Sequence, residues 1–179
     1  ENDEFLRIVA DVGCAIMGQS GSIAPADGRI YALRDVTGTV DCVPLITACI
    51  MSKKLAAGPR TIVIDLKTGS GAFMRDREQA RALAAALLAV GRAHGRTMAV
   101  VFSDMGQPLG RMIGHAHETL EALQALRPGG RGVAPADLVA LTEDLVAEMV
   151  LGAGLAPDPA AALEKVRTAW TEGTAWDRL

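Results

Sequence analysis

Three short apolar runs along the chain predict buried β-strands. They are too short to be solitary helices, and two of them are rich in Val and Ile. Their apolar residues are continuous rather than alternating with polar ones, which is typical of a sheet covered on both faces. The runs span residues 13–18, 61–67 and 97–103.

Helical patterns alternate with these runs. Residues 76–94 begin with Asp76 as an expected N-cap and end before Gly95, and their apolar side chains recur at helical spacing. This alternation predicts an α/β fold with a mainly parallel sheet flanked by helices, followed by trailing helices. The other predicted helices span residues 41–57, 108–126, 135–151 and 159–170.

Length and composition narrow the class of protein. The 179 residues are 50% hydrophobic, which is enough for a packed core and excludes wholesale disorder. We assign residues 1–130 to the central α/β portion and residues 131–179 to a helical extension of the same domain. The formal net charge is −3 and only 3% of the residues are aromatic, so we expect no nucleic-acid partner. Charged residues interrupt the longest apolar stretch, at 80–101, so we also expect no membrane-spanning helix.

Cysteines and the first residues indicate the compartment. Cys14, Cys42 and Cys49 form no CxxC pair and give an odd count, which predicts neither a disulfide framework nor a zinc site. The acidic start has no features of a signal peptide. We therefore expect a reducing, cytoplasmic setting. Because the first residue is not Met, we also expect the chain to lie within a longer parent protein.

Two loops follow predicted strands, where parallel sheets bind their ligands. Residues 67–74 follow one strand and residues 104–108 follow another. The Gly-Ser-Gly turn at 69–71 lets a backbone approach a ligand closely, but it matches no nucleotide-binding motif. An ordinary strand-to-helix turn explains the same pattern.

One face of the helix at 41–57 also carries candidate chemistry. Ile46, Cys49, Ile50 and Lys53 share this face by their spacing. Such a face offers a cation and a polar atom to a flat heterocycle. The spacing alone favours the ordinary alternative, an amphipathic helix whose terminal lysine reaches water.

Several long blocks of sequence share one order and spacing with a known family. They are residues 24–27, 31–41, 44–48, 52–55, 67–74, 104–105 and 107–110. On these blocks the chain resembles the thymidine and pyrimidine-nucleoside phosphorylase family, most densely from Val12 to Glu121. The resemblance implies a portion of the family's large α/β domain. The family's Lys-His-Ser-Thr-Gly-Gly phosphate loop is not within these 179 residues.

The resemblance also implies an activity. The family cleaves a pyrimidine nucleoside such as thymidine with phosphate, reversibly, to the free base and (deoxy)ribose 1-phosphate, with no cofactor. Arg34 and Lys53 are implied to bind the polar edge of the pyrimidine. Both would then act in catalysis by stabilising the negative charge that develops on the leaving base. The alternative for Arg34 is an ion pair with Asp35 or Asp41.

The remaining base contacts follow from the same resemblance. Ile46, Phe73 and Val40 are implied to form the apolar walls around the ring. Cys49 occupies the position of a serine that hydrogen-bonds the base in the family. Because a thiol is a weaker donor and acceptor than a hydroxyl, we expect affinity or base preference to change.

The resemblance further implies a cation site and a partner subunit. Some members of the family hold a monovalent cation such as potassium. The matching positions here are the carbonyls of Leu109 and Met112 and the carboxylate of Glu121. The parent protein is expected to be a homodimer.

Three functional hypotheses remain open from the sequence. The first is the base-binding part of a pyrimidine-nucleoside phosphorylase, inactive as 179 residues alone because the phosphate loop is elsewhere. The second is a relative of anthranilate-type phosphoribosyltransferases, which share the architecture. The third is a non-catalytic pyrimidine-binding or interaction module.

Overall fold

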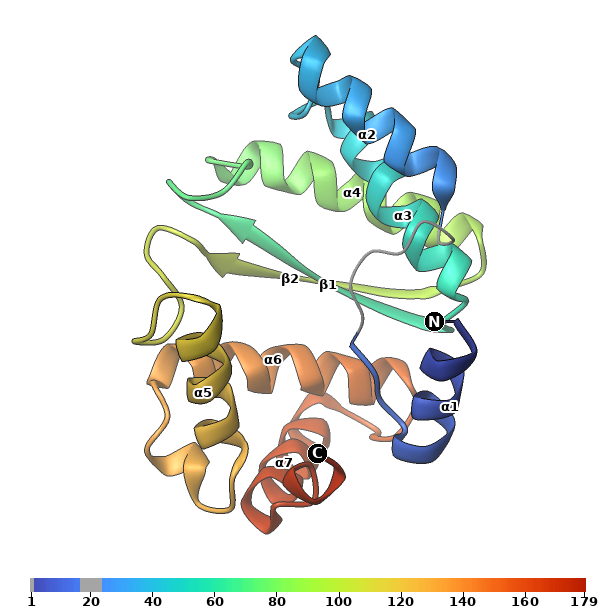
Figure 1. The fold of residues 1–179 in the computed structure, drawn as a ribbon. Helices are drawn as coiled ribbons and strands as arrows, with labels where there is room; N and C mark the ends of the chain where they lie inside the picture. The colour runs from blue at the N-terminus through green and yellow to red at the C-terminus, as the bar shows by residue number, and fades with distance from the viewer. Residues whose placement is uncertain (1, 17–23) are drawn as a thin grey trace.

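A two-stranded parallel sheet lies between helices in the computed structural model, which describes residues 2–16 and 24–179 (Figure 1). Strand β1 (Thr61–Thr68) pairs with β2 (Thr97–Asp104), with Thr61 opposite Thr97 and Thr68 opposite Asp104. Helix α4 (Arg77–Ala93) connects the two strands. The predicted α/β class with a parallel sheet is therefore confirmed.

The helices agree closely with the sequence pattern in four cases. The predicted ends of α3, α4, α6 and α7 lie within two residues of the observed ends. The pattern missed α1 and α2, which precede the first strand. The remaining bounds are α1 (Asn2–Val12), α2 (Pro25–Thr37), α3 (Val43–Ala57), α5 (His115–Leu126), α6 (Ala136–Gly152) and α7 (Pro159–Glu172), with short 3₁₀ turns η1 (Gly130–Gly132) and η2 (Trp176–Arg178).

The main apolar core lies between the sheet and the helices α3 and α4. Alternate residues of β1 are buried on this face because side chains of a strand point to opposite sides in turn. Asp76 caps α4 by accepting a hydrogen bond from the backbone N–H of Gln79, at 2.8 Å. The buried core residues are Met51, Ile62, Ile64, Leu66, Met74, Ala80, Leu83, Ala84 and Leu87.

Helix α6 covers the opposite face of the sheet. It contacts both strands, and α7 packs against α6 on the side away from the sheet (Figure 1). The Thr61 hydroxyl at the start of β1 donates a hydrogen bond to the carbonyl of Gly152 at the end of α6, at 2.8 Å. The first trailing helix is thus one layer of the α/β sandwich, and the domain boundary at residue 130 stays a prediction.

The predicted strand at residues 13–18 is wrong for the residues that the structure describes. Residues 13–16 form no strand, and residues 17 and 18 lie outside the described residues. The side chain of Ile16 is 99% exposed. Within the described chain the sheet consists of β1 and β2, so this run has no adjacent strand there to share its backbone hydrogen bonds.

The predicted start of the helix at residue 108 is also wrong. Helix α5 begins at His115, directly after Gly114, whose φ of 108° lies outside the helical region. The carboxylate of Glu121 accepts hydrogen bonds from the backbone N–H groups of Arg111, at 3.1 Å, and Met112, at 3.4 Å. These bonds hold the preceding residues as a loop.

None of the helices in residues 2–16 and 24–179 has the combined length and apolarity that crossing a membrane requires.

Candidate functional site

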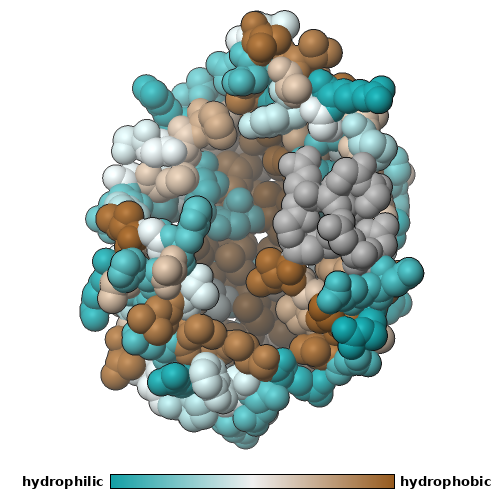
Figure 2. All heavy atoms as spheres, in the orientation of Figure 1, coloured by the Kyte–Doolittle hydropathy of each residue, from teal (hydrophilic) through white to brown (hydrophobic). Residues whose placement is uncertain are grey.

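A cavity of about 420 Å³ lies where α2 and α3 meet the carboxyl end of β1. Figure 2 shows the face in the orientation of Figure 1 hollowed near its centre, with hydrophobic residues inside the hollow. The structure brings five of the predicted site residues together on the cavity wall, which does not by itself test their roles. These five are Arg34, Val40, Ile46, Cys49 and Phe73.

Arg34 lies at the junction of α2 and α3 and is only 3% exposed. Its Nε donates to the carbonyl of Thr39, at 3.3 Å, and one terminal nitrogen donates to the carbonyl of Leu45, at 3.4 Å. The other terminal nitrogen donates to the carbonyl of Val40. Arg34 thus pairs with main-chain oxygens and with neither predicted carboxylate. A guanidinium has five N–H donors, so these three bonds leave donors for a ligand in the cavity.

Tyr31 supports the same guanidinium from one side. Its ring centroid lies 5.5 Å from the central carbon of the Arg34 guanidinium, within the range of a cation–π contact. Tyr31 precedes Arg34 by three positions on α2, so helical spacing places both side chains on one face. Both residues line the cavity.

Lys53 is held beside the cavity by an acidic residue of α2. Its Nζ lies 2.9 Å from the Oδ2 atom of Asp27 and 3.2 Å from the Sγ atom of Cys49. The Cys49 thiol in turn donates to the same Asp27 oxygen, at 3.5 Å. The three side chains form a triangle of contacts, which we call the Asp27–Cys49–Lys53 cluster.

Sequence reasoning missed Asp27 although a signal was present. Asp27 precedes Arg34 by seven positions, which is two turns of a helix and places both on one face. Both side chains are buried on that face. The sequence pattern did not predict α2 as a helix, so the face that Asp27 shares with Arg34 was not recognised.

The cluster perturbs the ionisation of two of its members. Burial raises the pKa of Asp27, but hydrogen bonds from Lys53 and Cys49 and the charges of Lys53 and Arg34 outweigh it, so the pKa lies below its usual value. The hydrogen bond to Asp27 raises the pKa of Lys53, against the opposing effect of burial. Lys53 is therefore a cation and Asp27 an anion at neutral pH.

The two predicted strand-end loops meet at the cavity. The backbone N–H of Gly71 donates to the carbonyl of Met105, at 3.0 Å, and the N–H of Met105 donates to the carbonyl of Thr68, at 2.6 Å. Both Gly71 and Met105 line the cavity. Phe73 follows on the first loop with 71% of its surface exposed. The ring thus lies at the cavity and is open to solvent.

A charged pair of β1 also reaches the cavity. The Nζ of Lys67 lies 2.7 Å from the Oδ2 atom of Asp65, and both residues line the cavity. The hydroxyl of Ser103 on the neighbouring strand donates to the other oxygen of Asp65. Sequence reasoning did not single out Asp65.

Glu121, one of the predicted cation ligands, binds backbone N–H groups in the structure. Its buried carboxylate accepts the backbone N–H groups of Arg111 and Met112. Among residues 2–16 and 24–179, no group of three or more His, Cys, Asp or Glu side chains is arranged to hold a metal ion. A monovalent cation held by the carbonyls of Leu109 and Met112 with Glu121 stays a prediction.

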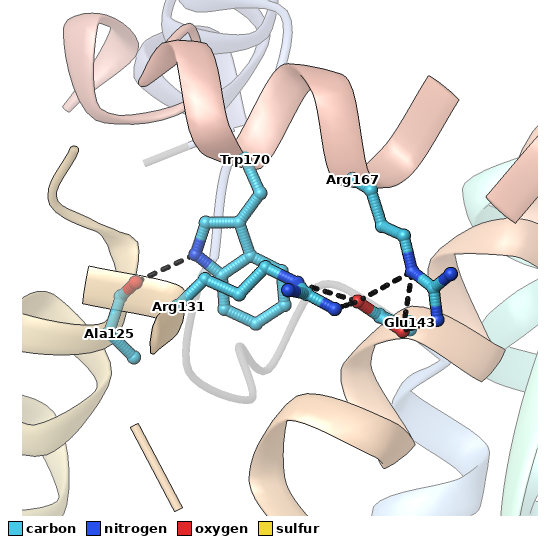
Figure 3. A network of polar contacts seen from close by, with 5 residues as sticks. All are labelled: Ala125, Arg131, Glu143, Arg167 and Trp170. Atoms are coloured by element: carbon cyan, nitrogen blue, oxygen red, sulfur yellow. Dashed lines mark hydrogen bonds and ion pairs between the residues drawn. The ribbon is translucent and has the colours of Figure 1, made fainter. Parts of the chain in front are cut away.

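Another buried carboxylate lies among the trailing helices, away from the residues of the cavity wall. Glu143 of α6 binds two arginines, with Arg131 Nε at 2.7 Å and a terminal nitrogen of Arg167 at 2.9 Å (Figure 3). Nearby, the indole N–H of Trp170 donates to the carbonyl of Ala125, at 2.7 Å. The Arg167 hydrogen bond is the largest cause that lowers the pKa of Glu143, and Arg131 adds to it against burial. This network joins α7 and η1 to α6.

Comparisons with known proteins identify the family of the chain. A family model described as "Glycosyl transferase family, a/b domain" matches residues 1–176. A pyrimidine-nucleoside phosphorylase of Staphylococcus aureus (strain bovine RF122 / ET3-1) is 48% identical over 177 residues, and the match covers 92% of this chain and 40% of the relative. The resemblance that the sequence blocks indicated is confirmed.

Further relatives carry the same name. A pyrimidine-nucleoside phosphorylase of Staphylococcus haemolyticus (strain JCSC1435) is 45% identical over 99% of this chain and 40% of its own length. One of Staphylococcus epidermidis (strain ATCC 12228 / FDA PCI 1200) is 49% identical over 83% of this chain and 33% of its own length. The chain thus spans about two fifths or less of the length of these relatives.

Proposed function

Because this chain belongs to the glycosyl transferase family whose α/β domain matches residues 1–176, we propose that it forms the base-binding part of a pyrimidine-nucleoside phosphorylase. The proposed reaction cleaves thymidine or a related pyrimidine nucleoside with phosphate, reversibly. Its products are the free base and (deoxy)ribose 1-phosphate. The main support is the cavity that gathers Arg34 and apolar walls beside the cation of Lys53.

The proposed binding mode places the ring between apolar side chains. Ile46 and Val40 lie on the cavity wall, and the exposed Phe73 ring closes over the opposite face. The polar edge of the pyrimidine then meets the remaining N–H donors of Arg34. Cys49 stands at the same wall and offers a thiol as a weak hydrogen-bonding partner.

The proposed chemistry depends on charge at that polar edge. The leaving base gains negative charge as the glycosidic bond breaks, while the sugar becomes cation-like. Arg34 and Lys53 stabilise this developing anion, and such positioned charges stabilise a transition state more than a ground state. Asp27 keeps Lys53 protonated and directed toward Cys49 at the cavity wall.

Phosphate is the co-substrate, and no residue of this cavity is assigned to it. The family's phosphate loop is not within the 179 residues, so we propose that this chain alone does not turn over nucleosides. The full-length protein is proposed to act as a homodimer. A monovalent cation such as potassium near Glu121 belongs to the same proposal.

The test uses the full-length protein that contains this chain. We expect release of thymine or uracil from the nucleoside only when phosphate is present, followed by ultraviolet absorbance. Replacing Lys53 with Met removes the cation and is expected to lower kcat/KM by about 100-fold or more. Lys54→Met is the matched control, because Lys54 is an exposed neighbour on α3.

The outcomes separate the competing hypotheses. Equal activity of the Lys53→Met and Lys54→Met variants would contradict the proposed role of Lys53. Turnover of a phosphoribosyl pyrophosphate substrate but not of nucleosides would favour an anthranilate-type phosphoribosyltransferase. Pyrimidine binding without any turnover would favour a non-catalytic binding module.

A further inference from the structure

Cys49 has an environment that differs from those of the other two cysteines. Its Sγ lies 3.2 Å from the Lys53 ammonium and 3.5 Å from Asp27, on the wall of the cavity. Cys14 is exposed, and Cys42 is half-buried at the start of α3. Within the described residues, only Cys49 combines a cation within hydrogen-bond distance with an opening to a cavity.

The nucleophilic form of a cysteine is the thiolate, which a neighbouring cation stabilises. Lys53 stays protonated because its hydrogen bond to Asp27 raises its pKa. The Asp27 carboxylate opposes a thiolate, but it lies farther from Sγ than the ammonium does, and it is itself paired with Lys53. The nearest full charge to the sulfur atom is therefore positive.

The cavity supplies access and room. Its volume of about 420 Å³ exceeds that of a small reagent, and mostly apolar residues surround Cys49 within it, including Ile46 and Ile50. Small, uncharged and partly apolar molecules therefore suit this space. The same space is the one proposed for the pyrimidine ring.

We propose that Cys49 is a modification site at which small, uncharged α,β-unsaturated carbonyl compounds add to the thiol from the cavity. The thiol proton passes to water, and Sγ forms a bond to the β-carbon of the reagent. The C=C π pair moves to the α-carbon, which takes a proton from water. The sum is addition of S–H across the double bond, with no oxidation and no leaving group.

The adduct blocks the cavity that the proposed function assigns to the base, and this consequence rests on that function. A ring attached to Sγ fills space between Ile46 and Phe73. It also displaces the Lys53 ammonium from the sulfur atom. Modification of this one residue is thus expected to prevent pyrimidine binding.

The test compares Cys14, Cys42 and Cys49 within the full-length protein under limiting N-ethylmaleimide at pH 7. Mass spectrometry of the peptides gives the rate at each site. Exposure alone predicts that Cys14 reacts before Cys49, whereas the Lys53 contact predicts that Cys49 reacts first. Lys53→Met removes the ammonium that lies 3.2 Å from Sγ and is expected to slow the reaction at Cys49 about tenfold, whereas Lys54→Met leaves the rate unchanged.

Further variants and a ligand separate this proposal from the proposed function. Asp27→Asn keeps an acceptor for Lys53, removes the opposing charge and is expected to speed the reaction at Cys49. Unchanged circular dichroism of each variant shows that the fold is kept. Slower reaction at Cys49 than at Cys14, or no effect of Lys53→Met, would overturn the proposal. A reactive Cys49 that neither thymine nor uracil protects would instead contradict the proposed function alone.

Discussion

At the scale of single residues, Gly69 determines how closely the two strand-end loops approach. Its φ is 119°, a conformation that side chains with a Cβ rarely adopt. A Cβ at this position would lie 2.7 Å from the backbone nitrogen of Gly106 and 2.9 Å from the Oδ1 atom of Asp104. The loops contact each other through main-chain atoms, so a side chain at this point has no space.

Replacing Gly69 with Ala is therefore expected to lower the free energy of unfolding by about 2 kcal/mol or more, through backbone strain and contact with Gly106. Chemical denaturation measures the change. Gly28→Ala is the matched control, because Gly28 lies within α2 and a Cβ there would meet no atom within 4 Å. This control is expected to match or exceed the wild-type stability. Equal losses in both variants would show that the loop contact is not the cause.

At the scale of elements, helical periodicity predicted part of the candidate site. The spacing of Ile46, Cys49 and Lys53 placed them on one face of α3, and the structure brings that face to the cavity or its rim. The spacing could not show that Arg34 bonds to the carbonyls of the segment between α2 and α3, since those bonds depend on the path of an irregular segment. Asp27 was missed for the related reason that α2 itself was not recognised.

Side-chain contacts across elements explain the wrong helix start. Pro at the first turn of a helix is a common pattern, and Pro108 followed by apolar residues fitted it. The carboxylate of Glu121 instead binds backbone N–H groups of the preceding loop, and Asp137 of α6 binds the N–H of Gly110, at 2.9 Å. These contacts join residues that are nine or more positions apart, so local periodicity carries no signal for them.

The attachment of α7 and η1 to α6 depends on Glu143. Its side chain is 7% exposed, so replacement by Gln leaves two arginines without their carboxylate. We expect Glu143→Gln to lower the free energy of unfolding, because two arginines lose their charged partner. The loss is limited to about 1–3 kcal/mol, because Arg131 and Arg167 remain partly hydrated. Asp144→Asn, at the exposed neighbouring position, is expected to change little. An equal effect of both changes in thermal denaturation would contradict the assigned role.

At the scale of the whole molecule, the α/β class followed from the alternation of apolar runs and helical patterns. The apolarity of the strand runs correctly indicated helices on both faces of the sheet, which α4 and α6 provide. The same property misled at residues 13–16, because apolarity reports burial and not the presence of an adjacent strand. Pairing is a property of the assembled sheet, so one run cannot reveal it.

The stability of the molecule is expected to fall in acid. Asp27 and Glu143 both have a folded-state pKa below the ordinary values of 3.8 and 4.5. Their contribution to the free energy of unfolding is present at pH values above the unfolded-state pKa. It is lost as the pH falls through the lower folded-state pKa. The melting temperature should therefore decrease below about pH 4. The Glu143→Gln variant should decrease less steeply there, and parallel curves for wild type and variant would contradict this origin.

The hydrogen bond between Thr61 and Gly152 joins positions 91 residues apart. During synthesis both β1 and β2 have emerged once Asp104 leaves the ribosome, yet α6 is complete only after residue 152. At about 5–20 residues per second the intervening residues take several seconds to appear. For that time the face of the sheet that carries Val63, Ala99 and Val101 has no α6 over it, so these apolar side chains stay open to water until that helix has formed.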